Sequence, residues 1–121
     1  MKTILGLTAI AIYLSSAAVS HAMSTLWTTG LFNDAATNAY CVVTNVTSKT
    51  ITVGIDVFDT NGVNVSSQTL QVGSQQTAAS NANSIFGTVC RFTVPSKNAV
   101  RANVCMSNSG ASTCLNSEVA R

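Results

Sequence analysis

Hydrophobic and polar residues alternate most regularly over residues 51–65, where the sequence is ITVGIDVFDTNGVNV. Four β-branched residues share one side of an extended backbone: Ile51, Val53, Ile55 and Val57. Because successive side chains of a strand point to opposite faces, this alternation predicts a strand with one buried face. Residues 59–62 (Asp-Thr-Asn-Gly) supply turn chemistry, and Val63 and Val65 then resume the alternation. The stretch therefore predicts a β-hairpin.

Other β-branched and aromatic runs predict further short strands. They lie at residues 25–30, 40–46, 70–72, 75–79, 88–94, 100–106 and 112–119. The poor alternation of 25–30 predicts a strand at a sheet edge. The polar compositions of 33–38 and 80–84 predict loops, and the polar pair at 66–67 is expected to precede the strand that ends at residue 72.

Residues 88–94 and 100–106 are the best alternating pair after the first hairpin. In 88–94, Cys90 lies on the apolar side with Phe92, whereas in 100–106 Cys105 lies on the polar side with Arg101. The turn between them contains the only proline of the chain, at a position where no ladder donor is needed. This arrangement predicts a second hairpin.

Short strands separated by regular turn signals are typical of an all-β protein. The chain is long enough for one modest core. We therefore expect a single antiparallel β-sandwich of about seven or eight strands, and we expect an Ig-like topology at this length.

Residues 1–22 have the features of a secretory signal. Lys2 precedes an apolar run over 4–14, and Ser-His-Ala at 20–22 has the small-x-small form of a cleavage site, with 16–18 as a second candidate. The apolar run is too short to span a bilayer. We expect 1–22 to be removed and 23–121 to form the β-sandwich domain, with no membrane insertion after removal. The protein is then secreted, periplasmic or attached to the cell surface.

The expected mature chain carries little charge. Residues 23–121 contain five cationic and four anionic side chains, for a net charge of +1. A nucleic-acid partner would require a dense basic face, so this class of partner is excluded. Arg91, Lys97 and Arg101 form a candidate basic patch on the outer face of the second hairpin, with a solvated sheet surface as the alternative.

All four cysteines lie in the expected mature chain, and an even count in a short exported protein predicts two disulfides. Four cysteines allow three pairings. If 88–94 and 100–106 form a hairpin that buries its apolar faces together, Cys90 and Cys105 point to opposite sides. Their Cβ atoms are then too far apart to be bridged.

Strand register selects between the remaining pairings. In the last predicted hairpin, setting Val104 opposite Leu115 places Cys105 opposite Cys114 on the outer face. The other two cysteines are then left to bond each other. The sequence therefore predicts two disulfides, Cys41–Cys90 and Cys105–Cys114.

The sequence offers no catalytic set. His21, the only histidine, leaves with the signal, so a nucleophile activated by histidine is excluded. Asp56 and Asp59 point to opposite faces of a strand, and Asp59 has a role in its turn. Residues 59–62 resemble the start of a calcium loop but lack the later ligands. We expect no catalytic residues, no metal site and no cofactor.

Two pairs of residues suggest ligand contacts or modification. Trp27 and Tyr40 are candidates for stacking on a sugar ring, although a sandwich of this size favours its large aromatics in the core or packed at an edge. Asn45 and Asn64 each begin an N-glycosylation pattern.

Two functions are consistent with these features. The first is a secreted, disulfide-stabilised, non-enzymatic structural or interaction domain that acts by edge-strand association with a protein partner or by self-assembly. The alternative is a small carbohydrate-binding module, with a glycan as ligand. Trp27, Tyr40, Arg91, Lys97 and Arg101 are the candidate ligand contacts.

Overall fold

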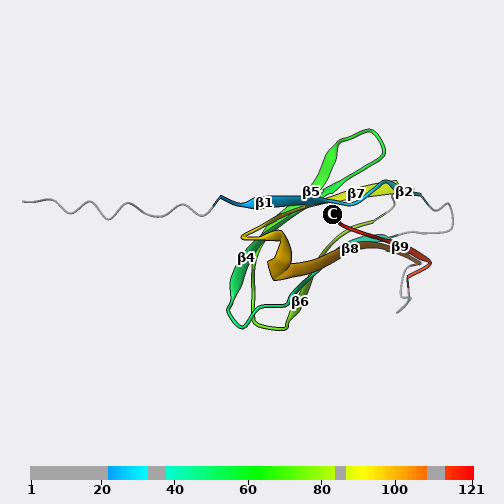
Figure 1. The fold of residues 1–121 in the computed structure, drawn as a ribbon. Helices are drawn as coiled ribbons and strands as arrows, with labels where there is room; N and C mark the ends of the chain where they lie inside the picture. Colours follow the sequence, from blue (N-terminus) through cyan, green and yellow to red (C-terminus); the bar gives the residue numbers. More distant parts are fainter. Residues whose placement is uncertain (1–21, 33–37, 84–86, 109–113) are drawn as a thin grey trace, which may run out of the picture.

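Two antiparallel sheets pack face to face in the computed structural model, which describes residues 22–32, 38–83, 87–108 and 114–121 (Figure 1). The first sheet contains β1 (Ser24–Trp27), β7 (Gly87–Val94), β4 (Ile51–Phe58) and β5 (Asn64–Val72) in that order, and β2 (Leu31–Phe32) also pairs with β7. The second sheet contains β6 (Thr77–Asn83), β3 (Asn38–Asn45), β8 (Val100–Ser107) and β9 (Asn116–Val119) in that order. The predicted all-β sandwich is confirmed.

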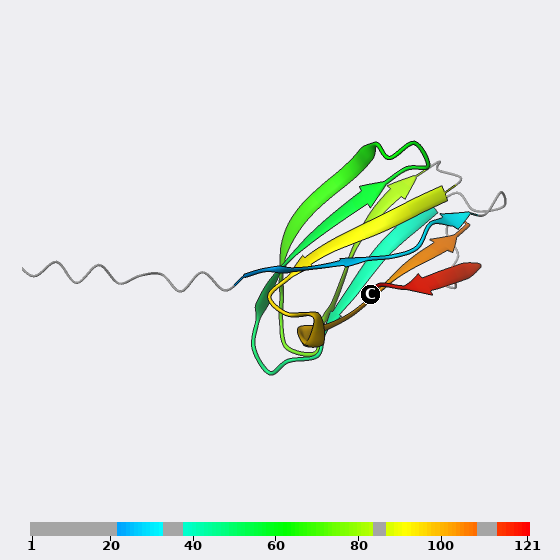
Figure 2. The same ribbon diagram turned by 45° about the horizontal axis from the view of Figure 1, so that its top comes forward.

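The described part of the chain forms nine strands rather than seven or eight, and the Ig-like topology is not confirmed. The predicted hairpin of 88–94 and 100–106 is wrong, because β7 and β8 lie in different sheets. The 3-10 helix η1 (Lys97–Ala99) follows β7 and leads the chain into the second sheet (Figure 2). β7 and β8 each have one apolar face, and these two faces meet across the core. Alternation along a strand is the same whether the two strands pair in one sheet or face each other from two sheets, so it does not distinguish these two arrangements.

The apolar inner faces of the two sheets form the core. Val53, Ile55 and Val57 of β4 are fully buried, as their alternation predicts. Phe92 of β7 and Val104 of β8 are also fully buried, from opposite sheets. Burial of this kind is the main favourable term in folding, at about 25 cal/mol for each Å² of apolar surface.

The predicted hairpin of 51–65 is confirmed as β4 and β5. Oδ1 of Asp59 accepts hydrogen bonds from the backbone N–H groups of Asn61 and Val63, each at 2.9 Å. Gly62 has a φ of 77°, a conformation that glycine adopts without a Cβ penalty. However, Val65 is exposed, because β5 is an edge strand whose side chains are mostly in solvent.

Strands β5 and β6 extend further than the sequence indicates. β5 runs without a break through the polar pair at 66–67, and β6 includes residues 80–83, which were expected to be a loop. Both strands lie at sheet edges and have few buried side chains. Edge strands of this kind form through backbone pairing, so polar composition does not exclude them. Residues 33–37, part of the other predicted loop, lie outside the described residues.

Both predicted disulfides are present in the structure. Cys41 of β3 and Cys90 of β7 are fully buried and join the two sheets across the core, with their Cα atoms 5.7 Å apart. The Cys105–Cys114 disulfide has a Cα–Cα distance of 5.4 Å. The register used to predict the second disulfide is wrong, since Cys105 lies opposite Ser117. Cys114 instead lies just before β9, and its disulfide covers Cys105 on the outer face of the second sheet.

Asn45, at the end of β3, is a fully buried polar residue that joins three segments. Its Nδ2 donates to the carbonyl oxygens of Lys49, Val72 and Gly73 at 2.7, 2.9 and 3.1 Å. Its Oδ1 accepts from the backbone N–H and from the hydroxyl of Thr47, at 2.9 and 2.7 Å. Because buried polar groups need partners, this residue fixes the β3–β4 connection against the end of β5.

Candidate functional site

The outer face of the five-stranded sheet carries a row of four cross-strand neighbours, one from each strand except β2. In order across the sheet they are Trp27 of β1, Arg91 of β7, Asp56 of β4 and Ser67 of β5. Cross-strand neighbours on one face lie close enough for their side chains to interact. The alternation of each strand gives these positions the outward phase, but only the strand order brings them into one row.

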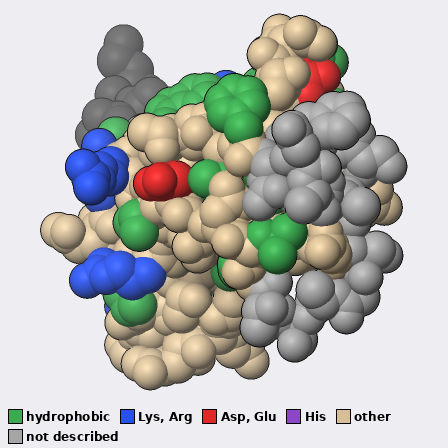
Figure 3. Space-filling model, turned by 90° about the vertical axis from the view of Figure 1, so that its right-hand side faces the viewer, with side chains coloured by type: hydrophobic (Ala, Val, Ile, Leu, Met, Phe, Trp, Pro, Cys, Tyr) green, Lys and Arg blue, Asp and Glu red, His purple; other side chains and the backbone are tan. Residues whose placement is uncertain are grey.

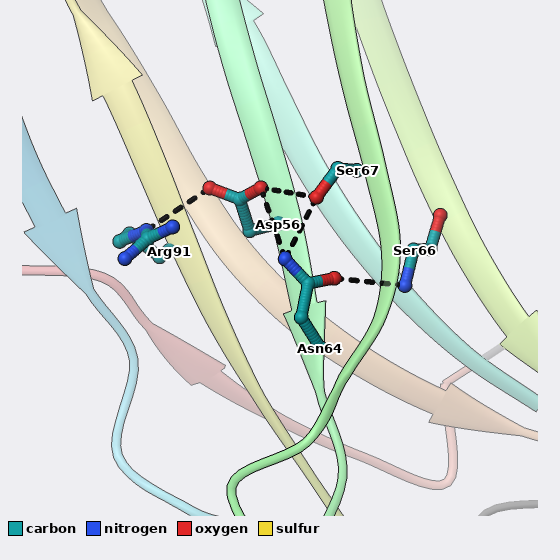
Figure 4. Close-up of polar contacts among 5 residues, drawn as sticks. All are labelled: Asp56, Asn64, Ser66, Ser67 and Arg91. Carbon is teal, nitrogen blue, oxygen red and sulfur yellow. Dashed lines mark hydrogen bonds and ion pairs between the residues drawn. The ribbon is translucent and has the colours of Figure 1, made fainter.

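Asp56 is the polar centre of this row (Figure 4). Its Oδ2 accepts a hydrogen bond from Nε of Arg91 at 3.0 Å, and its Oδ1 accepts from the hydroxyl of Ser67 at 2.6 Å. Asn64 donates from Nδ2 to the Ser67 hydroxyl at 2.7 Å and to Oδ1 of Asp56 at 3.5 Å. Oδ1 of Asn64 accepts from the backbone N–H of Ser66 at 3.1 Å. The network joins β7, β4 and β5.

The pKa of Asp56 reflects opposing effects. Burial of the carboxyl group raises its pKa, but the hydrogen bonds from Ser67 and Arg91, the positive charge of Arg91 and the contact with Asn64 lower it. The net pKa lies below the ordinary value of 3.8. The carboxylate is therefore charged at neutral pH and orients Arg91.

Arg91 packs against two aromatic rings on the same face. Its guanidinium carbon lies 5.3 Å from the ring centroid of Trp27 and 5.0 Å from that of Phe58. The two rings are 5.7 Å apart between centroids and tilted by 32°. These distances fall within the range of cation–π and aromatic interactions. The salt bridge to Asp56 thus holds a cation beside an aromatic pair made of the exposed Trp27 and the half-buried Phe58.

Beyond this pair, the outer face is hollowed. The hollow has a volume of about 390 Å³, and nine residues line it: Trp27, Gly30, Phe32, Phe58, Asp59, Thr60, Gly62, Thr88 and Val89. Trp27 is 45% exposed and Phe32 is 68% exposed. We refer to this feature as the aromatic hollow. It is apolar over most of its surface and has one carboxylate, that of Asp59, in its lining.

Gly87 allows the wall of the aromatic hollow to form. It lies opposite Phe32 in the β2–β7 pairing. A Cβ atom at this position would lie 2.7 Å from a Phe32 ring carbon and 2.6 Å from the methyl carbon of Thr60. Since real Cβ atoms do not make such contacts, glycine is required for Phe32 and Thr60 to approach the strand.

The two aromatic residues singled out from the sequence do not share a site. Trp27 lies on the outer face of the first sheet, whereas Tyr40 belongs to β3 in the second sheet, where it lies opposite Cys105. Of the two roles expected for them, the core or an edge, burial in the core is not observed, because neither is buried. Trp27 packs against Phe58 on the edge strand β1. The core is filled by Phe92 and by aliphatic residues. Phe32 and Phe58, which the sequence reasoning did not select, lie beside Trp27 instead.

The predicted basic patch is not formed. It required β7 and β8 to be hairpin partners, but Arg91 lies on the first sheet, Arg101 lies on the second, and Lys97 lies in η1. Arg91 is also engaged by Asp56. Figure 3 shows one face of the molecule, on which charged side chains are few and stand among uncharged polar atoms.

The two glycosylation patterns differ in accessibility. Nδ2 of Asn45, the atom that would carry a glycan, is buried and donates to three carbonyl groups. A glycan at this position is incompatible with the fold. Asn64 is exposed at the start of β5. The structure therefore leaves Asn64 as the accessible acceptor of the two.

The two lateral sides of the sandwich differ. On one side the backbone of Trp27 in β1 exchanges two hydrogen bonds with that of Arg121, each 3.0 Å long, and Arg121 follows β9 of the opposite sheet. This contact connects the edges of the two sheets (Figures 1 and 2). On the other side lie the edge strands β5 and β6. Within the part of the chain that the structure describes, no further strand pairs with β5 or β6 on that side.

Among the described residues, no helix has the length and apolar character needed to cross a membrane. No three histidine, cysteine or acidic residues there are grouped so that they could hold a metal ion. A scan against protein-family models and searches of curated proteins and of solved structures find no match to this chain.

Proposed function

We propose that this protein is an extracellular or periplasmic, non-enzymatic interaction domain that associates through the free edge of β5 with a second copy of itself. Its two disulfides are typical of a protein from an oxidising compartment. A small sandwich with a covalently joined core is a suitable scaffold for such a role.

The observation that carries the proposal is the composition of the open side. β5 has nine residues, NVSSQTLQV, and β6 has seven, TAASNAN. Neither contains a charged residue or a proline. Natural proteins usually protect exposed edge strands with lysine, proline or a short length, because unpaired backbone groups invite pairing with another chain. The long β5 edge has none of these protections.

A second copy is the partner that the charge distribution favours. When β5 strands pair antiparallel around Gln68, uncharged side chains lie opposite uncharged side chains, and no like charges meet. The nearest charged residue on β4, Asp56, is neutralised by Arg91. The expected mature chain has a net charge of +1, so long-range repulsion between copies is weak.

Sedimentation of the oxidised protein over a range of concentrations tests this proposal. We expect concentration-dependent association of the wild type and its loss in Gln68→Lys, since the charge is placed in the middle of the edge strand. Gln75→Lys is the matched control, because Gln75 is an exposed residue of the turn after β5 and the change in charge is the same. A wild type that remains monomeric up to about 1 mM contradicts the proposal, given that this limit corresponds to about 4 kcal/mol of binding free energy. Equal association of both variants also contradicts it.

A further inference from the structure

We propose that the aromatic hollow is a binding site for the ring of a neutral sugar. This site is separate from the β5 edge: its lining residues come from β1, β2, β4 and β7 and from the β1–β2 and β4–β5 connections. Its volume of about 390 Å³ falls within the range of small-molecule sites, about 300–1,000 Å³.

The aromatic side chains of the hollow are arranged as a platform. Phe32, Phe58 and Trp27 all stand on the outward phase, next to Gly87, Val89 and Arg91 of β7 respectively. Trp27 and Phe32 are exposed and Phe58 is half-buried. Apolar groups that gather on a surface in this way usually mark a binding site. The flat faces of these rings match the apolar face of a pyranose ring.

The charges around the hollow indicate a neutral ligand. The lining contains no lysine or arginine, and the neighbouring guanidinium of Arg91 is already paired with Asp56. The carboxylate of Asp59 would repel an anion. A cationic ligand is also disfavoured, since the guanidinium of Arg91 already lies 5.3 and 5.0 Å from the rings of Trp27 and Phe58. The ligand that remains is uncharged.

Polar groups at the rim favour a hydroxylated ligand over a purely apolar one. The Asp59 carboxylate is held in place by the backbone N–H groups of Asn61 and Val63, each at 2.9 Å. A fixed carboxylate is a strong acceptor for hydroxyl groups. Thr60 is exposed on the same rim. Aromatic faces with a fixed acceptor beside them fit a sugar ring and its hydroxyl groups.

The only tryptophan of the chain, Trp27, lies in the hollow and provides the signal for a test. Fluorescence titration of the oxidised protein would use neutral oligosaccharides of glucose, galactose, mannose and N-acetylglucosamine, up to about 10 mM, which detects dissociation constants in the millimolar range. We expect a saturable fluorescence response to at least one of these sugars. Phe32→Ala should raise the dissociation constant about three- to tenfold, because that factor corresponds to the loss of one aromatic contact. Tyr40→Ala, which truncates a ring on the other sheet, should leave it unchanged.

Three outcomes would each overturn the proposal. The first is no fluorescence response to any of the four sugar classes, and the second is a response that Phe32→Ala leaves unchanged. The third is a stronger response to tetramethylammonium, phenol or a sulfated sugar. Because Phe32 is 68% exposed, its truncation should leave the fold intact, which the unfolding midpoint checks. The Gln68→Lys variant separates the two proposals: it should retain sugar binding whether or not it abolishes association.

Discussion

Trp27 and Arg121 lie in segments that belong to opposite sheets, yet their backbones exchange two hydrogen bonds, each 3.0 Å long. Ala120 precedes this contact and donates its N–H to the carbonyl of Ala102 in β8 at 2.9 Å. The chain thus leaves β9 and reaches β1, and it connects the two sheets on one side of the sandwich.

Removal of residues 120–121 should open that side. Three backbone hydrogen bonds are lost, so we expect the free energy of unfolding to fall by about 2–4 kcal/mol, at roughly 1 kcal/mol for each bond. Urea unfolding measures this change. A truncated protein as stable as the wild type would mean that the contact contributes nothing to the stability of the fold. Arg121→Ala is the control, because it removes the side chain and keeps the backbone.

Replacement of Asn45 by alanine should be one of the most destabilising single changes in the chain. It removes five hydrogen bonds, one of which reaches the carbonyl group of Val72 in the buried interior. We expect a loss of about 3–5 kcal/mol, in the range reported for broken buried networks. Thermal and urea unfolding measure it. Asn64→Ala is the matched control at an exposed position and should cost less than about 1 kcal/mol.

The two disulfides should contribute unequally to the free energy of unfolding. The chain-entropy relation gives a stabilisation of about 4 kcal/mol for Cys41–Cys90, whose residues are 49 apart in sequence. It gives about 2.6 kcal/mol for Cys105–Cys114, whose residues are 9 apart. Double alanine variants of each pair, unfolded in urea, test the order. A larger loss for the second pair would contradict a mechanism based on loop length.

The free energy of unfolding should depend on pH through the ionisation of Asp56. A carboxylate with a lowered folded-state pKa stabilises the fold above its unfolded pKa, and that contribution is lost as pH falls through the folded pKa. The contribution of Asp56 is therefore complete above pH 3.8 and declines below it. We expect the difference in unfolding free energy between wild type and Asp56→Asn to shrink below pH 3.8. Glu118→Gln, an exposed carboxylate in β9, is the control, and a difference independent of pH would contradict the role of Asp56.

Local pattern accounts for the hairpin of β4 and β5. Its strand alternates strictly, and Asp59 and Gly62 have the side chain and the φ angle that the turn requires. The same alternation gives Cys90 an inward phase and Cys105 an outward one, in agreement with the observed disulfides. Strand phase and turn geometry depend on neighbours within a few residues, so the amino-acid sequence determines them by itself. The choice of disulfide partners depends on tertiary structure as well, since the hairpin and the register that predicted them are both absent from the fold.

Assignment of strands to sheets was decided only by the tertiary structure. β7 and β8 alternate in the same way whether they pair side by side or face each other across a core, and they face each other. The proposed sites depend on that choice. Arg91 meets Asp56 and Trp27 because β7 lies between β4 and β1, and Phe32 joins the hollow because Gly87 leaves room for it. Contacts between strands that are distant in sequence depend on the order of strands in the sheet. The alternation of residues along a single strand carries no information about that order.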